Sequence, residues 1–168
     1  MNNCIPIIPT QNCEPVKSYK PGSPERKEAI SEYNKLMNKV VDIPMFINGK
    51  NIKSNKTKYI YPPHNHKHIV GKYYEGNKTH VINAIDSALK AKKEWASMDF
   101  SARASIFLKA AELLRGPFRQ KINTATMIGQ SKNIYQAEID AACELIDFLN
   151  FNVKFANEIY QKQPESSK

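Results

Sequence analysis

KNIYQAEIDAACELIDFLNFNVKFANEIY, residues 132–160, is the stretch of sequence that decides the fold of this chain. It contains neither proline nor glycine, and its length would give roughly eight turns of α-helix. Apolar side chains recur along it every three or four residues, which places them on one face of a helix; they are Ile134, Ile139, Ala142, Ile146, Leu149, Val153 and Ala156. We therefore predict a single long helix from about Lys132 to Tyr160.

Four further helices are predicted before this one, over residues 24–40, 79–95, 101–116 and 117–129. The first begins with a Ser-Pro pair, and the second and third begin at a Thr and a Ser, which are favoured capping residues. The apolar stripe of the second helix comprises Val81, Ile82, Ile85, Ala88, Leu89 and Trp95. The inward face expected for the third comprises Ile106, Phe107, Ala110, Leu113 and Leu114.

Short strands are predicted between the first two helices. Residues 45–47 and 50–53 flank an Asn-Gly pair, which favours the positive φ angles of a hairpin turn, so these two segments should pair. Residues 59–61 and 68–74 predict two more strands. The expected fold class is therefore mostly helical, with a small antiparallel β-meander from about residue 45 to residue 74.

Composition divides the chain into three parts. Residues 1–24 hold five of the ten prolines, which predicts an extended and poorly packed arm. Residues 25–162 carry the predicted helices and strands, and residues 163–168 form a polar tail.

The overall composition, 41% hydrophobic and 24% charged, is that of a globular protein. No apolar run approaches the ~20 residues of a membrane helix, which argues against channels and transporters. The three cysteines are widely spaced, and Cys4 and Cys13 have no partner nearby in the sequence. A disulfide framework or a zinc finger is therefore excluded, and a reducing compartment fits best.

The net charge of +9 is concentrated in one region, because residues 47–93 carry ten Lys and only two acidic residues. The chain as a whole has 21 Lys but four Arg. Nucleic-acid-binding proteins usually rely on Arg and on stacking aromatic side chains. Binding to nucleic acid is therefore kept only as a less favoured alternative to a solvated, lysine-rich surface.

The most suggestive pattern for a metal site is the His-x-His-x-His run of His64, His66 and His68. On a strand, the three imidazoles would face one side, a geometry that zinc accepts. No carboxylate or thiol follows at ligand spacing, and Pro62-Pro63 makes the segment a loop. A solvated loop is the preferred interpretation, and His80 is expected at the surface.

Cys143 and the acidic residues around it are the remaining candidates for chemistry. A nucleophilic cysteine needs a base or a helix N-terminus to lower its pKa, whereas Cys143 lies mid-helix beside Glu144 and Asp147. We therefore expect a packing role for Cys143. Asp140, Glu144 and Asp147 share one helical face and Glu138 points to another side. A solvated or salt-bridged acidic face is expected here, not an acid–base pair.

The glycines complete no nucleotide-binding motif. Gly71 and Gly76 have the spacing of a P-loop, but Asn77 stands where that motif requires Lys. Neither GxGxxG nor GxSxG occurs. The sequence therefore predicts no catalytic, no cofactor-binding and no metal-binding residue in this chain.

Several segments nevertheless resemble the start of the aldehyde dehydrogenase superfamily. Phe46–Lys50 (FINGK) is similar to the opening hairpin of that family, and Ala84–Trp95 is similar to its first helix. Arg103, followed by Phe107–Leu114, is similar to its second helix.

Other segments resemble one branch of the family, the delta-1-pyrroline-5-carboxylate dehydrogenases of proline catabolism. They are Gly22–Arg26, Pro63–His66, and Gln136–Ala142 with Glu144–Phe148, which continues into Phe151-Asn152 and is the most specific. The similarity extends from about Glu14 to Pro164.

The resemblance implies that residues 25–162 form the amino-terminal part of an aldehyde dehydrogenase-like domain, an incomplete version of an α/β fold. Full-length members are longer, and they oxidise glutamate semialdehyde to glutamate with NAD. Nothing here matches their NAD-binding turn, catalytic Cys, general-base Glu or oxyanion-stabilising Asn. We therefore expect this chain alone to be inactive and to bind no cofactor.

Three functions stay open at this point. The chain is interpreted as a truncated amino-terminal segment of such a dehydrogenase, or as a non-catalytic module that pairs with dehydrogenase subunits or with itself, or, less favoured, as a basic nucleic-acid-binding protein. Exposed apolar patches are expected, because the predicted helices lack a sheet to pack against. The resemblance implies the mitochondrial matrix, but residues 1–16 contain no Lys or Arg. No transit peptide is visible, and a cytoplasmic location is the alternative.

Overall fold

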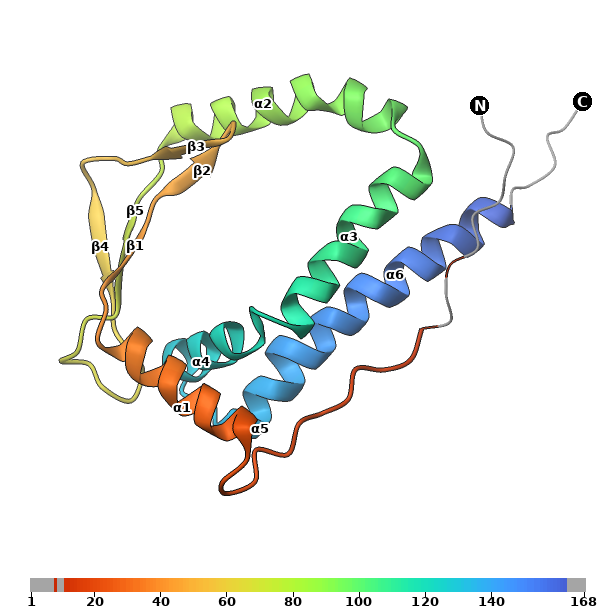
Figure 1. The fold of residues 1–168 in the computed structure, drawn as a ribbon. Coiled ribbons are helices and arrows are strands. Elements are labelled where there is room, and N and C mark those ends of the chain that lie inside the picture. The colour runs from red at the N-terminus through yellow and green to blue at the C-terminus, as the bar shows by residue number, and fades with distance from the viewer. Residues whose placement is uncertain (1–7, 9–10, 163–168) are drawn as a thin grey trace, which may run out of the picture.

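The computed structural model describes residue 8 and residues 11–162 (Figure 1). Predictions on Cys4, on the rest of the arm over residues 1–7 and 9–10, and on the polar tail at 163–168 lie outside the described residues. The elements are α1 Pro24–Met37, β1 Val41–Ile43, β2 Met45–Ile47, β3 Lys50–Ile52, β4 Thr57–Ile60, β5 Gly71–Tyr74, α2 Lys78–Ser97, α3 Phe100–Arg115, α4 Arg119–Gln130, α5 Ile134–Ala137, η1 Glu138–Cys143 and α6 Glu144–Gln161. The predicted class, mostly helical with a few strands, is confirmed.

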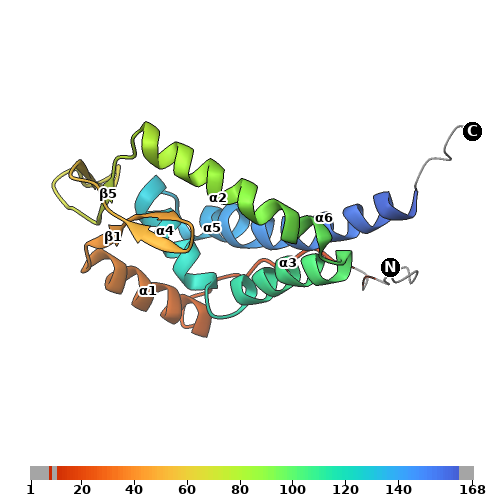
Figure 2. The same cartoon turned by 90° about the horizontal axis from the view of Figure 1, so that it is seen from above.

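The strands and the helix pair α3–α6 occupy opposite ends of the molecule. Figure 1 shows the strands at one end, the pair α3–α6 at the other, and α2 running between them. The view from above in Figure 2 keeps α3 and α6 side by side, and α1 packs mainly on α4. The amino-terminal arm follows α6 toward the start of α1.

Two helices are capped two residues earlier than predicted. The Asn77 side-chain oxygen accepts a hydrogen bond from the His80 backbone N–H, and the Asn77 N–H donates to Nδ1 of His80, both at 3.1 Å. This reciprocal cap starts α2, and Thr79 lies inside the first turn instead. Asp99, not Ser101, occupies the capping position of α3, without a side-chain hydrogen bond.

The long helix predicted from Lys132 to Tyr160 contains a π-helical turn. α5 continues directly into η1 and then into α6. A π-turn bonds each residue to the fifth along the chain, so Glu138 and Cys143 both face the interior and are 0% and 5% exposed. The apolar spacing does not reveal this turn, although the predicted burial of Ile146 and Val153 is confirmed.

The two antiparallel strand pairings are confirmed, but the single meander is wrong. β2 pairs with β3 around Asn48 and Gly49, both at positive φ, and β4 pairs with β5. β1 was not predicted, and it pairs in parallel with β5, so that the strands form a separate hairpin and a three-stranded sheet of order β1-β5-β4. The Val41 N–H donates to the Val70 carbonyl at 2.9 Å, a pairing between distant residues that no local pattern indicates.

The contact between α3 and α6 is made through small side chains. Ala104 and Ala111 are the buried residues of α3, and their size allows the two helices to approach closely. Ile106, Phe107 and Leu113 were predicted to face inward, yet they are 49%, 44% and 38% exposed. The prediction is wrong for Ile106 and Leu113, which lie on the opposite side of α3 from Ala104 and Ala111, whereas Phe107 is partly covered by the Trp95 ring of α2.

α2 leaves its apolar stripe open. Val81, Ile82, Ile85 and Leu89 are all between 45% and 61% exposed, and the helix has no buried residue. The element it chiefly contacts is β2. Exposed apolar patches were expected, and they are confirmed here. Across the described residues, none of the helices combines the length and the apolar character that a membrane crossing requires.

Candidate functional site

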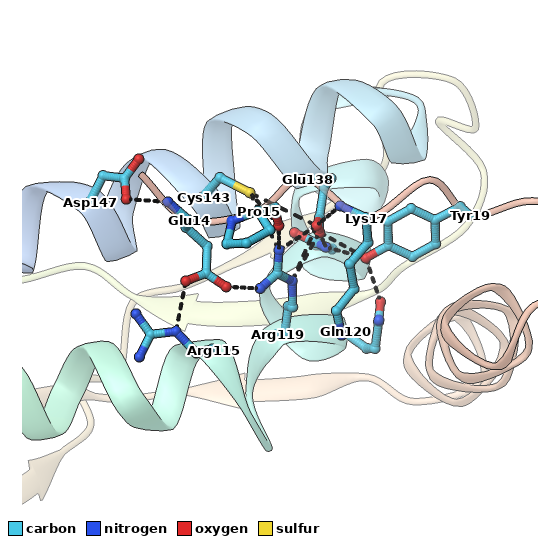
Figure 3. A network of polar contacts seen from close by, with 11 residues as sticks. Glu14, Pro15, Lys17, Tyr19, Arg115, Arg119, Gln120, Glu138, Cys143 and Asp147 are labelled. Carbon is cyan, nitrogen blue, oxygen red and sulfur yellow. Dashed lines mark hydrogen bonds and ion pairs between the residues drawn. The ribbon is translucent and has the colours of Figure 1, made fainter. Parts of the chain in front are cut away.

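Glu138 lies at the centre of a buried polar network (Figure 3). The π-turn directs this carboxylate into the interior, where it is 0% exposed. It accepts hydrogen bonds from the Tyr19 hydroxyl at 2.8 Å, from the Lys17 backbone N–H at 2.8 Å and from the Asn123 side chain at 2.7 Å. The Arg119 guanidinium completes the set with Nη2 at 2.5 Å.

Arg119 connects this carboxylate to a second one. It begins α4, is 2% exposed, and its Nη1 donates to Glu14 of the arm at 2.5 Å. Its Nη2 also donates to the Pro15 carbonyl at 2.9 Å, and Arg115 approaches the other Glu14 oxygen at 2.7 Å. Two guanidinium groups thus face two carboxylates. The charges are balanced, which is the condition under which ions can be buried.

The arm is therefore packed where the network lies, contrary to the predicted poor packing. Glu14 and Tyr19 are 7% and 4% exposed, and the Glu14 N–H donates to the Asp147 carboxylate at 2.7 Å. Tyr19 has a φ of 51°, a left-handed conformation that a non-glycine residue adopts only when its surroundings hold it there. Proline content alone indicated the extended path of the arm but not these contacts.

Burial and charge shift the pKa values of the network in opposite directions. Burial raises the pKa of Tyr19 to about 12, and its hydrogen bond to the Glu138 carboxylate adds to the shift. For Glu138 itself, burial pushes the pKa upward, but the hydrogen bonds from Arg119 and the Lys17 N–H outweigh burial and leave the pKa below its usual value. The carboxylate is thus ionised and occupied by donors, not poised to exchange a proton.

Cys143 belongs to the same network as a packed thiol. Its sulfur lies 3.4 Å from Arg119 Nη2 and 3.8 Å from the Pro15 carbonyl. Burial and, to a lesser extent, the charge of Glu138 together raise the pKa of Cys143 to about 11. A thiol with this pKa is almost fully protonated at neutral pH and is a poor nucleophile, which agrees with the packing role predicted from the sequence.

The acidic residues expected on a solvated or salt-bridged face are divided between two environments. Asp140 pairs with Lys132 at 2.5 Å on the surface, and Glu144 is exposed. Asp147 binds the arm through the Glu14 N–H. Glu138 points to another side, as predicted, but that side is the interior.

The histidines of the His-x-His-x-His run point to separate partners. His64 Nδ1 lies 2.8 Å from the Ser131 hydroxyl, and His68 Nε2 donates to the Met37 carbonyl at 2.7 Å, while His66 is exposed. Within the described part of the chain, no three His, Cys, Asp or Glu side chains gather in a way that could hold a metal ion.

The network can fasten the arm to four helical elements: α3 through Arg115, α4 through Arg119, η1 through Glu138 and α6 through Asp147. Sequence reasoning missed Arg119, Glu14, Tyr19 and Asn123. One signal was available for Arg119: it precedes Ile122 by three residues, which places a charge next to an apolar face. The absence of catalytic and cofactor-binding residues from this chain stays a prediction.

Comparison with known proteins assigns the fold. The model of the aldehyde dehydrogenase family matches residues 51–168. A probable delta-1-pyrroline-5-carboxylate dehydrogenase from Schizosaccharomyces pombe is 45% identical over 158 residues, which cover 94% of this chain and 29% of that protein. The mitochondrial delta-1-pyrroline-5-carboxylate dehydrogenase of Homo sapiens is 42% identical over 153 residues, covering 91% of this chain and 27% of its own length.

A solved structure matches equally well. The delta-pyrroline-5-carboxylate dehydrogenase from Mycobacterium tuberculosis, in a crystal structure with bound NAD, superimposes with a TM-score of 0.94 at 42% identity. The match covers 99% of this chain and 31% of that one. The chain thus spans about three tenths of the length of these relatives, and their catalytic and NAD-binding regions are not covered by it.

Proposed function

Since this chain belongs to the aldehyde dehydrogenase family, we propose that it forms the amino-terminal part of a delta-1-pyrroline-5-carboxylate dehydrogenase, an enzyme that oxidises glutamate semialdehyde to glutamate with NAD. The observation that carries the proposal is the match with the Mycobacterium tuberculosis enzyme over 99% of this chain at 42% identity. At that identity, the branch of the family and its substrate class are supported as well as the fold.

The described residues do not fit NAD, so we assign no chemical step to them. A nicotinamide dinucleotide is normally held by a glycine-rich turn between a strand and a helix, and no such turn occurs in this sequence. Cys143, the buried thiol, is protonated and covered. The role proposed for this chain is to build scaffold, not to carry out the oxidation.

Two structural features support a scaffold role. The network of Glu14, Arg119 and Glu138 holds the amino-terminal arm against α4 and η1. The apolar stripe of α2 and the outer side of α3 remain exposed, and surfaces of this kind are normally covered in a complete domain. The remaining part of a dehydrogenase subunit would cover them.

Partners and location follow from the same proposal. We expect the chain to associate with itself or with dehydrogenase subunits, because its exposed apolar side chains favour burial. We also propose the mitochondrial matrix as its location, because relatives such as the human protein are described as mitochondrial. Fractionation of cells that express a tagged chain tests this, and a cytosolic pool would contradict it.

A chimera tests the proposed function. In it, the matched segment of the Schizosaccharomyces pombe relative is replaced by this chain. The chimera should reduce NAD in the presence of glutamate semialdehyde with an efficiency within about tenfold of the parent protein. The parent is the positive control, and the parent without its matched segment is the negative one. A soluble, folded chimera without activity would overturn the proposal.

A further inference from the structure

An apolar groove with one charged residue runs between α3 and α6. It has a volume of about 560 Å³, and the two helices that form its walls lie side by side in both views (Figures 1 and 2). Its lining is almost wholly apolar and includes Trp95, Phe107, Leu145, Phe148 and Val153.

The aromatic side chains that line the groove are partly exposed to solvent, and contacts between their rings hold them in place. Trp95, Phe107 and Phe148 are 40%, 44% and 54% exposed. Trp95 packs edge-on against Phe107 with ring centroids 6.5 Å apart, and Phe100 packs on Tyr160 at 4.9 Å. Aromatic side chains held in this way form a preformed surface onto which apolar groups can dock at little entropic cost.

Arg103 is the only charged residue among those that line the groove. Its Nη2 donates to the Tyr160 hydroxyl at 3.0 Å, but its Nε is buried and has no acceptor. Arg115 and Arg119 both meet carboxylates, whereas Arg103 forms no ion pair with any described residue. A guanidinium fork left partly unsatisfied in apolar surroundings favours a carboxylate as its partner.

We infer that this groove docks an apolar polypeptide segment carrying one carboxylate, which the remaining part of a dehydrogenase subunit supplies and which binds Arg103. The inference rests on the proposed function, since the chain covers only 31% of its solved relative. It goes beyond that function in naming the surface and the chemistry of the segment: aliphatic or aromatic side chains against Phe107 and Phe148, and an Asp or Glu opposite the guanidinium.

The test compares Arg103→Met in two settings, the 168-residue chain alone and the chimera described above. Methionine keeps much of the apolar stem and removes the charge. In the chain alone, the folding equilibrium measured by urea denaturation should change less than about threefold, because only a hydrogen bond to Tyr160 is lost. In the chimera, the same substitution should shift the equilibrium toward unfolding by roughly tenfold to a hundredfold, because a paired carboxylate is left buried.

Two further variants keep the outcome decisive. Lys109→Met, on the same helix in an exposed pair with Glu112, should be nearly silent in both settings. Arg103→Lys retains the charge and should recover part of the stability of the chimera. Equal effects of Arg103→Met in the two settings would overturn the inference, because Arg103 would then act only within this chain.

Failure of this inference and failure of the proposed function give different results. An inactive but folded chimera contradicts the function, whereas an active chimera that is indifferent to Arg103→Met contradicts only the docking contact. The alternative occupant of the groove is a second copy of the chain, and analytical ultracentrifugation of the isolated chain tests for it. If the chain forms a dimer that Arg103→Met dissociates, the groove is an interface between copies and the inference is wrong.

Discussion

Replacing Glu138 by glutamine tests whether the buried network holds the arm in place. The substitution keeps the shape of the side chain but removes its charge, so Arg119 loses one of its two carboxylates and the donors of Tyr19, Lys17 and Asn123 lose an anionic acceptor. Removing one partner of a buried ion pair costs about 3–5 kcal/mol. Because Glu14 still neutralises Arg119, we expect the lower end, about 3 kcal/mol.

Urea denaturation, monitored by far-ultraviolet circular dichroism, measures the change in the free energy of unfolding. The rate of trypsin cleavage after Lys17 or Lys20 reports whether the arm is released. Asp140→Asn is the matched control, because Asp140 lies two residues away and pairs with Lys132 on the surface. Its cost should be below about 1 kcal/mol. If Glu138→Gln and Asp140→Asn destabilise the chain equally, and trypsin cleaves the arm at an unchanged rate, the reasoning is refuted.

The other predictions concern single groups and surfaces. Cys143 is buried and its pKa is raised to about 11, so it should react with a disulfide reagent only on unfolding, whereas the exposed Cys13 should react at once. Mass spectrometry of the labelled peptides distinguishes the two cysteines, and equally fast labelling would contradict the burial of Cys143. The folded-state pKa of Tyr19, raised from 10 to about 12, means that its contribution to stability is present below pH 10 and lost as the pH rises toward 12; Tyr19→Phe should remove this alkaline dependence, and a dependence that persists in the variant points to another group. Lys53 and the Tyr74 hydroxyl lower the pKa of Asp42 to about 2, so Lys53→Met should raise it in an NMR titration; an unchanged value would show that the pair does not form. The exposed face of α2 predicts that the isolated chain binds a hydrophobic dye or self-associates, and a monomer that binds no dye argues against that.

Local patterns predicted the helices well because each helix carries its own signal. The stripe that contains Ile146 and Val153, and the Asn48-Gly49 turn, reflect interactions within a few residues along the chain. The cap at Asn77 was missed since Thr79 is also a good capping residue, and only the hydrogen bonds with His80 distinguish the two.

Most of the other missed features depend on residues that are far apart in the sequence. The parallel pairing of Val41 with Gly71 and the contact of Glu14 with Arg119 bring together segments that share no period. The π-turn at Glu138–Cys143 changes which residues face inward without changing the composition of the helix. A charged residue in the middle of a helical run resembles a solvated one until its partner is known, and this is why Glu138 was not identified as buried.

Assaying the purified 168-residue chain for NAD reduction with glutamate semialdehyde tests most directly the claim that this segment builds scaffold and leaves the oxidation to other parts of an enzyme. No glycine-rich nucleotide-binding turn occurs in the sequence, and burial raises the pKa of the Cys143 thiol to about 11. We therefore predict no aldehyde-dependent formation of NADH and no measurable binding of NAD. Cys143→Ser should change stability slightly and leave this baseline as it is. Aldehyde-dependent NADH formation by the isolated chain, abolished by Cys143→Ser, would contradict the claim.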